Sequence, residues 1–218
     1  MPRSTSSGVS RSDIVEQLIT VCHALYEHGY VTATDGNVSA RLGNGNILTT
    51  RSVLNKGKTQ SADLVEVNLN GDIVKGKAVP STELKMHLYI YSQRPDAMAV
   101  VHAHPVYATG FAVAGKPIPN DVLPEVAVNF GGVPLARYGT PSTDSLALSL
   151  APFIHTHSAI LLQNHGVVTF GRTLEDAYFK MEKVEHAAHI LTVAESLGGP
   201  VRLPQGEVER LRAVYKKK

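Results

Sequence analysis

The sequence predicts an α/β protein of the α+β type, in which helices pack on a central, mainly antiparallel sheet. Short apolar segments that suit strands follow one another closely, and Asn44-Gly45 and Asn70-Gly71 separate two pairs of them. Asn-Gly is a strong hairpin signal because both residues tolerate the positive φ of a tight turn. Longer segments with the helical spacing of apolar residues lie near both ends of the chain, which completes the mixed pattern.

The first helix is predicted over residues 12–28. Ser12 suits the N-cap, Asp13 suits the positive start of the helix dipole, and Gly29 can adopt the left-handed conformation that ends a helix. Apolar periodicity and the positions of glycine and proline predict the other elements. Strands are expected at residues 38–41, 47–50, 64–68, 72–75, 99–104, 134–138, 159–163 and 167–170, and further helices at 81–93, 105–115, 143–154, 174–197 and 206–215.

Composition and charge indicate one compact domain. The chain has 218 residues, 43% of them hydrophobic and 18% charged, which is typical of a globular protein that needs no disulfide or metal to fold. We expect a flexible polar lead at residues 1–9 and a single domain over residues 10–218. The one cysteine, Cys22, has apolar neighbours and is expected to be buried and inert, as suits a reducing compartment.

The same features exclude several partners. The net charge is +2, and neither basic cluster, at residues 56–58 or 216–218, is large enough or accompanied by aromatic residues to form a nucleic-acid-binding face. Positive charge near Lys56 would favour a small anionic substrate instead. No apolar run approaches the roughly 18 residues of a membrane span, and no signal sequence is visible. We therefore expect a cytoplasmic protein that binds neither nucleic acid nor membrane.

The ten histidines include two His-x-His pairs. His102 and His104 lie in an apolar segment predicted as a strand, where residues i and i+2 point to the same face. Two imidazoles side by side in apolar surroundings are costly without a partner, and neutral imidazole is a good ligand for zinc-like metals. The pair therefore predicts either a metal site or two core histidines bonded to backbone carbonyls. His155 and His157 flank a predicted helix end, where a histidine interacts favourably with the helix dipole.

His165 stands between a predicted strand and Gly166, where a polar side chain would extend into a cleft at the end of the strand. With His102 and His104 it would complete a three-histidine set, which leaves coordination positions open for water or substrate. The remaining histidines are expected to have structural roles; they are His23, His28, His87, His186 and His189.

Two polar segments are candidates for binding an anion. Ser81-Thr82-Glu83 lies at a predicted helix start, where free backbone amides and the helix dipole favour negative charge, although a carboxylate there is also ordinary helix chemistry. Residues 34–39 offer small polar groups around a flexible glycine, either as a simple turn or as an anion cradle.

Four motifs together resemble the class II aldolase/adducin family, and the likeness runs from about residue 12 to residue 197. The motifs are Gly36-Asn37-Val38-Ser39, Pro80-Ser81-Thr82-Glu83, His102-Ala103-His104-Pro105 and Gln163-Asn164-His165-Gly166. This resemblance implies a three-layer α/β/α fold and a ring-shaped homotetramer with active sites at subunit interfaces. It also implies functional residues: Zn²⁺, or another divalent cation such as Mn²⁺ or Co²⁺, on His102, His104 and His165, catalysis by Glu83, and substrate phosphate contacts from Gly36, Asn37, Ser52, Ser81 and Thr82.

The activity that the resemblance implies is retro-aldol cleavage of a ketose 1-phosphate, similar to L-fuculose 1-phosphate, to dihydroxyacetone phosphate and an aldehyde. Three alternatives stay open: an aldolase for 5-deoxyribulose 1-phosphate or a related sugar phosphate, a decarboxylase of a 3-oxo-tetronate 4-phosphate-type sugar acid, and a non-catalytic, adducin-like binding module. Two positions depart from the family's pattern. Arg51 and Ser52 end a loop in which the family often has proline and glycine, and Glu125 stands where a neighbouring subunit is expected to supply a tyrosine.

Overall fold

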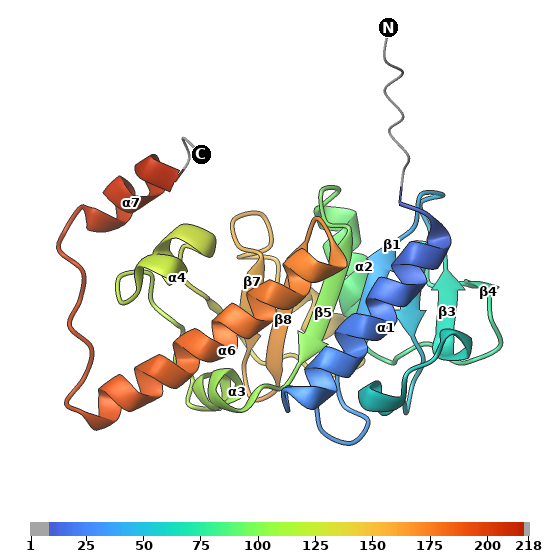
Figure 1. The fold of residues 1–218 in the computed structure, drawn as a ribbon, viewed down its shortest axis with the longest axis horizontal. Coiled ribbons are helices and arrows are strands. Elements are labelled where there is room, and N and C mark those ends of the chain that lie inside the picture. Colours follow the sequence, from blue (N-terminus) through green and yellow to red (C-terminus); the bar gives the residue numbers. More distant parts are fainter. Residues whose placement is uncertain (1–8, 216–218) are drawn as a thin grey trace, which may run out of the picture.

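The computed structural model describes residues 9–215, which form an eight-stranded sheet between two layers of helices (Figure 1). The strands follow the order β4-β3-β2-β1-β5-β8-β7-β6. Their bounds are β1 Asn37–Arg41, β2 Ile47–Thr50, β3 Leu64–Val67, β4 Ile73–Lys75, β5 Ala99–Ala103, β6 Leu135–Ala136, β7 Ala159–Leu162 and β8 Gly166–Gly171. All neighbours pair antiparallel except β6 and β7, so the predicted α/β fold with a mainly antiparallel sheet is confirmed. The lead predicted at residues 1–9 lies, apart from Val9, outside the described residues, as do the lysines at 216–218.

Helices cover both faces of the sheet. On one face lie α1 (Arg11–Glu27), α3 (Val106–Val113) and α6 (Leu174–Ser196), and on the other lie α2 (Leu84–Gln93) and α5 (Asp144–Ser149). Figure 1 shows α1 and α6 running across the near side of the sheet, with α2 behind it. The short helices α4 (Pro124–Asn129) and α7 (Glu207–Tyr215) pack against each other at one end of the molecule.

Alternation along β5 decides which helix layer each side chain meets. Val101 and Ala103 pack in the core formed with α1, α3 and α6, whereas Val100 packs in the second core, formed with α2 and α5. Because successive side chains on a strand point to opposite faces, His102 lies on the same face as Val100. This parity brings the imidazole of His102 to the face that α2 covers.

The start of α1 differs from the prediction. Ser10, and not Ser12, is the N-cap: its hydroxyl accepts a hydrogen bond from the Asp13 amide at 3.2 Å, and the Asp13 carboxylate accepts one from the Ser10 amide at 3.0 Å. This reciprocal capping box needs a spacing of three residues, which Ser12 does not have. Gly29 has a φ of +70°, which confirms the predicted left-handed conformation after the helix.

Other boundaries shift by a few residues. The helix predicted from residue 81 starts at Leu84, with Glu83 as its N-cap residue, and the helix predicted over 143–154 is regular only over Asp144–Ser149. Strand β5 ends at Ala103, so His104 lies just beyond it. Three short elements were not predicted because they are too short to show periodicity: α4 and the 3-10 helices η1 (Lys56–Lys58) and η2 (Ser61–Asp63). Over residues 9–215 no helix has the length and apolar composition needed to cross a membrane.

Candidate functional site

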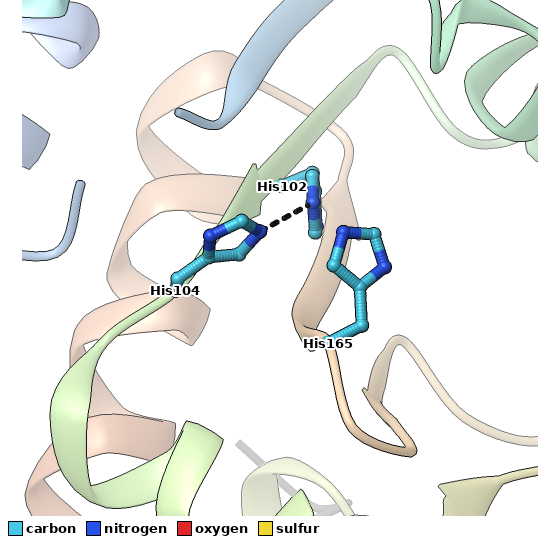
Figure 2. Close-up of side chains that lie close together, drawn as sticks. All are labelled: His102, His104 and His165. Carbon is cyan, nitrogen blue, oxygen red and sulfur yellow. Dashed lines mark hydrogen bonds between the residues drawn. The ribbon is translucent and has the colours of Figure 1, made fainter. Parts of the chain in front are cut away.

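Three imidazoles converge where β5 and β8 meet. His102 is the penultimate residue of β5, His104 follows the strand, and His165 lies in the turn between β7 and β8. Ala103 pairs with Val167 across the two strands, and this register places the residues next to each strand end close together. The ring centroids lie 4.7–5.0 Å apart, and one nitrogen of each ring lies within 4.8 Å of the others (Figure 2). The three rings could therefore hold one metal ion.

Hydrogen bonding orients His102 for such a role. Its Nδ1 lies 2.9 Å from the carbonyl oxygen of Val167. A carbonyl only accepts hydrogen bonds, so Nδ1 carries a proton, and Nε2 is the nitrogen directed into the cluster. Burial lowers the pKa of His102, but the carboxylate of Glu83 raises it further, to above its usual value, so a cation that binds Nε2 would displace a proton from it. The Nε2 atoms of His102 and His104 are 3.1 Å apart, so both are directed into the same space. Burial and the charges of His102 and His165 lower the pKa of His104 to about 3, which keeps its ring neutral.

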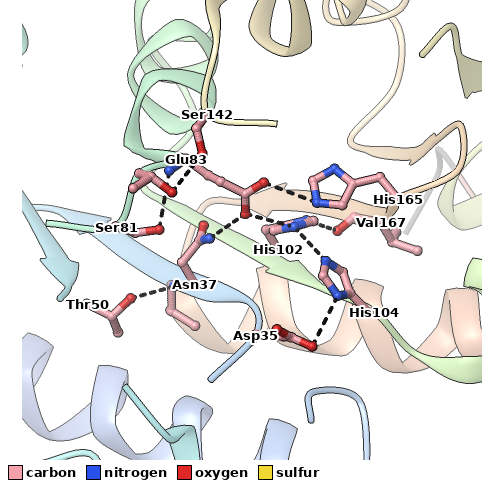
Figure 3. Close-up of polar contacts among 12 residues, drawn as sticks. Asp35, Asn37, Thr50, Ser81, Glu83, His102, His104, Ser142, His165 and Val167 are labelled. Atoms are coloured by element: carbon pink, nitrogen blue, oxygen red, sulfur yellow. Dashed lines mark hydrogen bonds and ion pairs between the residues drawn. The ribbon is translucent and has the colours of Figure 1, made fainter. Parts of the chain in front are cut away.

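Glu83 places a carboxylate beside the histidines (Figure 3). Its Oε2 lies 3.2 Å from Nε2 of His102, and its Oε1 lies 3.1 Å from Nε2 of His165. Asn37, which pairs with His102 across β1 and β5, donates from Nδ2 to Oε2 at 2.9 Å. Burial alone would raise the pKa of Glu83, but His102 and His165 hold it well below its usual range, so the group is a carboxylate.

The surroundings leave polar atoms without partners. The Oδ1 atom of Asn37 and the Nδ1 atom of His165 are buried and make no hydrogen bond. Buried polar atoms are rarely left in this state unless a ligand, ion or water completes the site. Three imidazole nitrogens directed at one point, with unsatisfied polar atoms around them, fit a divalent cation and its ligands.

Two glycines allow this arrangement. A Cβ on Gly166 would lie 2.5 Å from Cδ2 of His104 and 2.6 Å from the carbonyl oxygen of Ala103, so no larger residue fits there. A Cβ on Gly36 would lie 2.7 Å from the carbonyl oxygen of His102, and its φ of +71° is also unfavourable for other residues. Both glycines belong to the motifs that the sequence analysis singled out, and both let backbone approach the histidine cluster closely.

The histidines and Glu83 border a pocket of about 310 Å³. All five residues predicted to contact a phosphate line it; they are Gly36, Asn37, Ser52, Ser81 and Thr82. His104, His165 and Glu83 therefore share the lining of this pocket with hydroxyl and amide groups. The residues predicted to hold a metal, to catalyse or to contact a phosphate therefore all lie within or beside this pocket.

Ser142 is a pocket residue that the sequence analysis missed. Its hydroxyl donates to Oγ1 of Thr82 at 2.7 Å, and its φ of +65° is rare for a residue other than glycine. Among the described residues, the non-glycine residues with positive φ are Ala33, Val53, Ser142 and Asn164, and each lines the pocket or directly precedes a residue that does. Backbone strain of this kind concentrates at functional sites. The Ser142–Thr82 hydrogen bond joins residues 60 positions apart, so no local sequence pattern predicts it.

Arg51 and Glu125, at which the sequence departs from the family pattern, occupy different places: Arg51 lines the same pocket, and Glu125 does not. The guanidinium of Arg51 donates to Asp63 at 2.7 Å and to the carbonyl oxygens of Ser52 and Val53 at 3.1 and 3.0 Å, so it is engaged in holding its own loop. Glu125, in α4, lines a separate pocket of about 780 Å³ together with Tyr30.

The other histidines lie outside this cluster. Among residues 9–215, the set of His102, His104 and His165 is the one group of histidine, cysteine or acidic side chains placed to hold a metal. His189 stacks on Tyr107 with ring centroids 3.9 Å apart, and His23 lies 3.1 Å from the carbonyl oxygen of Thr59. These contacts agree with the structural roles that were expected for them.

His87 is buried next to the site and should make the fold acid-sensitive. Its Nδ1 lies 2.7 Å from the hydroxyl of Ser39, and burial, with the charge of His102, lowers its pKa from 6.5 to about 3. The folded chain keeps this ring neutral while the unfolded chain protonates it below pH 6.5, so stability falls as the pH falls from 6.5 towards 3. At pH 5 the expected loss is about 2 kcal/mol in the free energy of unfolding.

His87→Asn provides the comparison, since asparagine can still bond to Ser39 but does not titrate. Urea unfolding of the metal-free proteins at pH 7.5 and pH 5.0 measures the effect. The wild type should lose about 2 kcal/mol more than the variant between these two pH values. An equal loss in both proteins would show that His87 does not contribute.

The fold and the site define a class of protein, a three-layer α/β protein with a histidine cluster and a carboxylate at the edge of a polar pocket. Residues 16–192 match the family described as Class II Aldolase and Adducin N-terminal domain. The chain belongs to the class II aldolase and adducin family, which confirms the resemblance seen in its motifs, and its relatives support a lyase.

Three comparisons show how close the similarity is. The L-fuculose phosphate aldolase of Methanococcus maripaludis is 36% identical over 180 residues, which cover 82% of this chain and 96% of that protein. The 3-oxo-tetronate 4-phosphate decarboxylase of Escherichia coli is 32% identical over 204 residues, covering 91% of this chain and 94% of the relative. A solved structure of L-fuculose 1-phosphate aldolase superposes with a TM-score of 0.88 at 33% identity, covering 97% of this chain and all of that one.

Proposed function

We propose that this protein is a metal-dependent class II aldolase that cleaves a ketose 1-phosphate to dihydroxyacetone phosphate and an aldehyde. The observation that carries the proposal is the carboxylate of Glu83, which lies within 3.2 Å of two histidines of the cluster in a pocket that also carries hydroxyl and amide groups. Breaking a C–C bond beside a carbonyl needs stabilisation of negative charge and a group that moves a proton. Similarity to L-fuculose phosphate aldolases supports the substrate class.

His102, His104 and His165 would hold the metal. Three neutral imidazoles are the ligand set of zinc sites that keep a position open for substrate. The hydrogen bond from Nδ1 of His102 to Val167 supports this assignment because it leaves Nε2 free to bind. A divalent cation bound there supplies Lewis-acid stabilisation of the negative charge that develops on the substrate. We propose Zn²⁺, with Mn²⁺ or Co²⁺ as alternatives on the same ligands.

Glu83 would carry the proton to and from carbon. When the C3–C4 bond of the ketose breaks, the C4 hydroxyl gives up one proton and becomes the aldehyde, and C3 of the other fragment takes up one proton. The Glu83 carboxylate would accept the proton that is released and deliver it to C3, so the step balances. In the synthetic direction the same carboxylate removes that proton. The hydrogen bond from Asn37 Nδ2 to Oε2 supports this role because it fixes the orientation of the carboxylate.

The phosphate of the substrate would lie at the polar end of the pocket. Hydroxyl and amide donors suit phosphate oxygens, and a negatively charged acceptor strengthens each such hydrogen bond. The proposed contacts come from Gly36, Asn37, Ser52, Ser81 and Thr82, all of which line the pocket. Holding the phosphate there would place the carbonyl end of the substrate towards Glu83 and the histidines.

One observation favours a second candidate, decarboxylation of a phosphorylated 3-oxo sugar acid. The 3-oxo-tetronate 4-phosphate decarboxylase of Escherichia coli covers 91% of this chain at 32% identity. Loss of carbon dioxide from such an acid leaves negative charge beside a carbonyl, as aldol cleavage does, so the same residues would serve. Cleavage of 5-deoxyribulose 1-phosphate would use the same site, whereas an adducin-like binding module would have no use for Glu83 beside three convergent histidines.

We propose further that the active form is a cytoplasmic homotetramer with active sites at subunit interfaces. Glu125 and Ser81 line two separate pockets of the chain. A contribution from the α4 region to catalysis would therefore come from a neighbouring subunit. Light scattering after size exclusion tests this: four times the chain mass of 23.4 kDa supports the tetramer, and a single chain mass for the active protein contradicts it.

Metal analysis followed by a substrate panel tests the function. The purified protein should contain about one divalent cation per chain. Assayed on several ketose 1-phosphates and on a 3-oxo-tetronate 4-phosphate, it should release dihydroxyacetone phosphate, measured by a coupled reductase, without carbon dioxide. Carbon dioxide release without dihydroxyacetone phosphate would replace the first candidate by the second. A protein that carries no metal and turns over none of these compounds would leave only a binding role.

A further inference from the structure

Lys56 is an unusual feature next to the pocket because it is a buried lysine. Its side chain is 1% exposed, and its ammonium group donates to the carbonyl oxygens of Leu54 at 2.7 Å and Thr34 at 3.2 Å. Within the described part of the chain it forms no ion pair with a carboxylate. Burying a charge without a counter-ion is costly, so a lysine in this position needs an explanation beyond packing.

The two carbonyls belong to different walls of the pocket. Thr34 directly precedes the segment that includes Gly36 and Asn37, and Leu54 directly follows Ser52 and Val53. Both segments line the pocket. One ammonium group thus joins two loops that no strand pairing connects at these residues.

Both loops are strained next to the carbonyls that Lys56 binds. Ala33, which precedes Thr34, has a φ of +49°, and Val53, which precedes Leu54, has a φ of +50°. A β-branched or alanine residue avoids this region unless its surroundings impose it. The two hydrogen bonds from Lys56 hold the carbonyl groups of Thr34 and Leu54, the residues that directly follow the two strained positions.

The charge of Lys56 also offsets negative charge that lines the pocket. Its lining includes the carboxylates of Asp35 and Glu83, which would repel an incoming phosphate, and the guanidinium of Arg51, which is paired with Asp63. Lys56 interacts electrostatically with both pocket carboxylates. A buried cation beside the loops lowers the cost of bringing a dianion against these groups.

We propose that Lys56 is a positioning residue for the phosphate group of the substrate: it holds the two loops at the separation that binds phosphate and adds a positive charge beneath them. This inference rests on the proposed function, which places a phosphate in this pocket. It assigns no chemical step to Lys56, so it concerns substrate affinity and not the rate of bond cleavage.

The test compares Lys56→Met with Lys58→Met, using inorganic phosphate as the probe. Both substitutions remove one lysine charge from the 3-10 helix η1, but Lys58 is exposed and binds neither loop. Titration calorimetry of the metal-loaded proteins should show phosphate binding weakened at least about tenfold in Lys56→Met and within about twofold of wild type in Lys58→Met. In assays with the ketose 1-phosphate, Lys56→Met should raise KM by a similar factor while kcat changes less than about threefold and metal content stays unchanged.

A second variant, Lys56→Gln, keeps the test decisive if the Lys56→Met protein does not fold. Lys56→Gln retains N–H donors for the carbonyls but lacks the charge, so its far-UV circular dichroism should match wild type and its phosphate affinity should still fall at least about threefold. Phosphate affinity within twofold of wild type in the folded variant overturns the proposal. A wild-type protein that binds no millimolar phosphate overturns it as well. If phosphate binding depends on Lys56 but no ketose phosphate is cleaved, the proposed function fails and the role of Lys56 stands.

Discussion

Glu83→Gln is expected to retain the metal and to cleave the ketose 1-phosphate about 10³-fold more slowly than wild type. The amide has the shape of the carboxylate, so it still fits between His102 and His165. It cannot accept a proton from carbon or return one, and removal of a general acid or base typically costs roughly 10²–10⁴-fold in rate. Release of dihydroxyacetone phosphate at saturating substrate gives the rate, and elemental analysis of the same sample gives the metal content.

Glu66→Gln is the matched control for this substitution. Glu66 is also a buried glutamate, 5% exposed, and it accepts hydrogen bonds from Asn44 and Asn46 at 3.1 and 2.9 Å, away from the pocket. Its neutralisation should leave the rate within about twofold of wild type. Wild-type cleavage by Glu83→Gln would remove Glu83 from the proton transfer, and loss of metal from that variant would make Glu83 a ligand instead of a base.

Local rules of chain geometry predicted the part of the site that depends on one strand. The period of two along a strand predicted that His102 and His104 lie together, and their ring centroids are 4.9 Å apart, although β5 ends at Ala103 and His104 lies just beyond it. The Asn-Gly dipeptides predicted the β1–β2 and β3–β4 hairpins for the same reason, because a tight turn restricts its own two residues. These inferences needed no knowledge of distant parts of the chain.

Strand order decides the rest of the site, and no local pattern encodes it. Asn37 reaches Glu83 because β1 lies beside β5, and His165 reaches His102 because β8 lies on the other side of β5. These strands are separated by about 60 residues of chain in each direction, so their pairing depends on the whole core. The residues alone suggested His165 as a third ligand from its place before Gly166, and the family resemblance implied the rest of the site.

The burial of charged residues also depends on the whole fold and could not be predicted from local sequence. The lysine cluster at 56–58 was expected to present positive charge to a substrate, yet Lys56 is buried and Lys58 is exposed. A lysine prefers the surface, and its burial here arises only because two loops meet over it and offer carbonyl oxygens. Ser142 was missed for the same reason, since its contact with Thr82 depends on tertiary packing that brings together residues 60 positions apart.

His102→Ala is expected to lose the metal and the activity together. His102 is fully buried, its ring centroid lies 4.9 Å from that of His104 and 4.7 Å from that of His165, and its Nε2 faces both Glu83 and His104. With two imidazoles left, the site no longer offers the three protein ligands of an open zinc site. Metal content should fall from about one per chain to below about a tenth, and cleavage should fall at least as far as in Glu83→Gln.

His155→Ala separates this loss from the general effect of removing a histidine, because His155 is exposed and belongs to the other His-x-His pair. At free zinc 100 times its dissociation constant, binding stabilises a folded protein by about 2.7 kcal/mol, which for a chain of this size raises Tm by roughly 5–10 °C. Wild type and His155→Ala should both show this rise, and His102→Ala should not. A variant without His102 that still binds one metal per chain and gains the same thermal stability would contradict the three-histidine assignment, because the ion would then have to be held elsewhere.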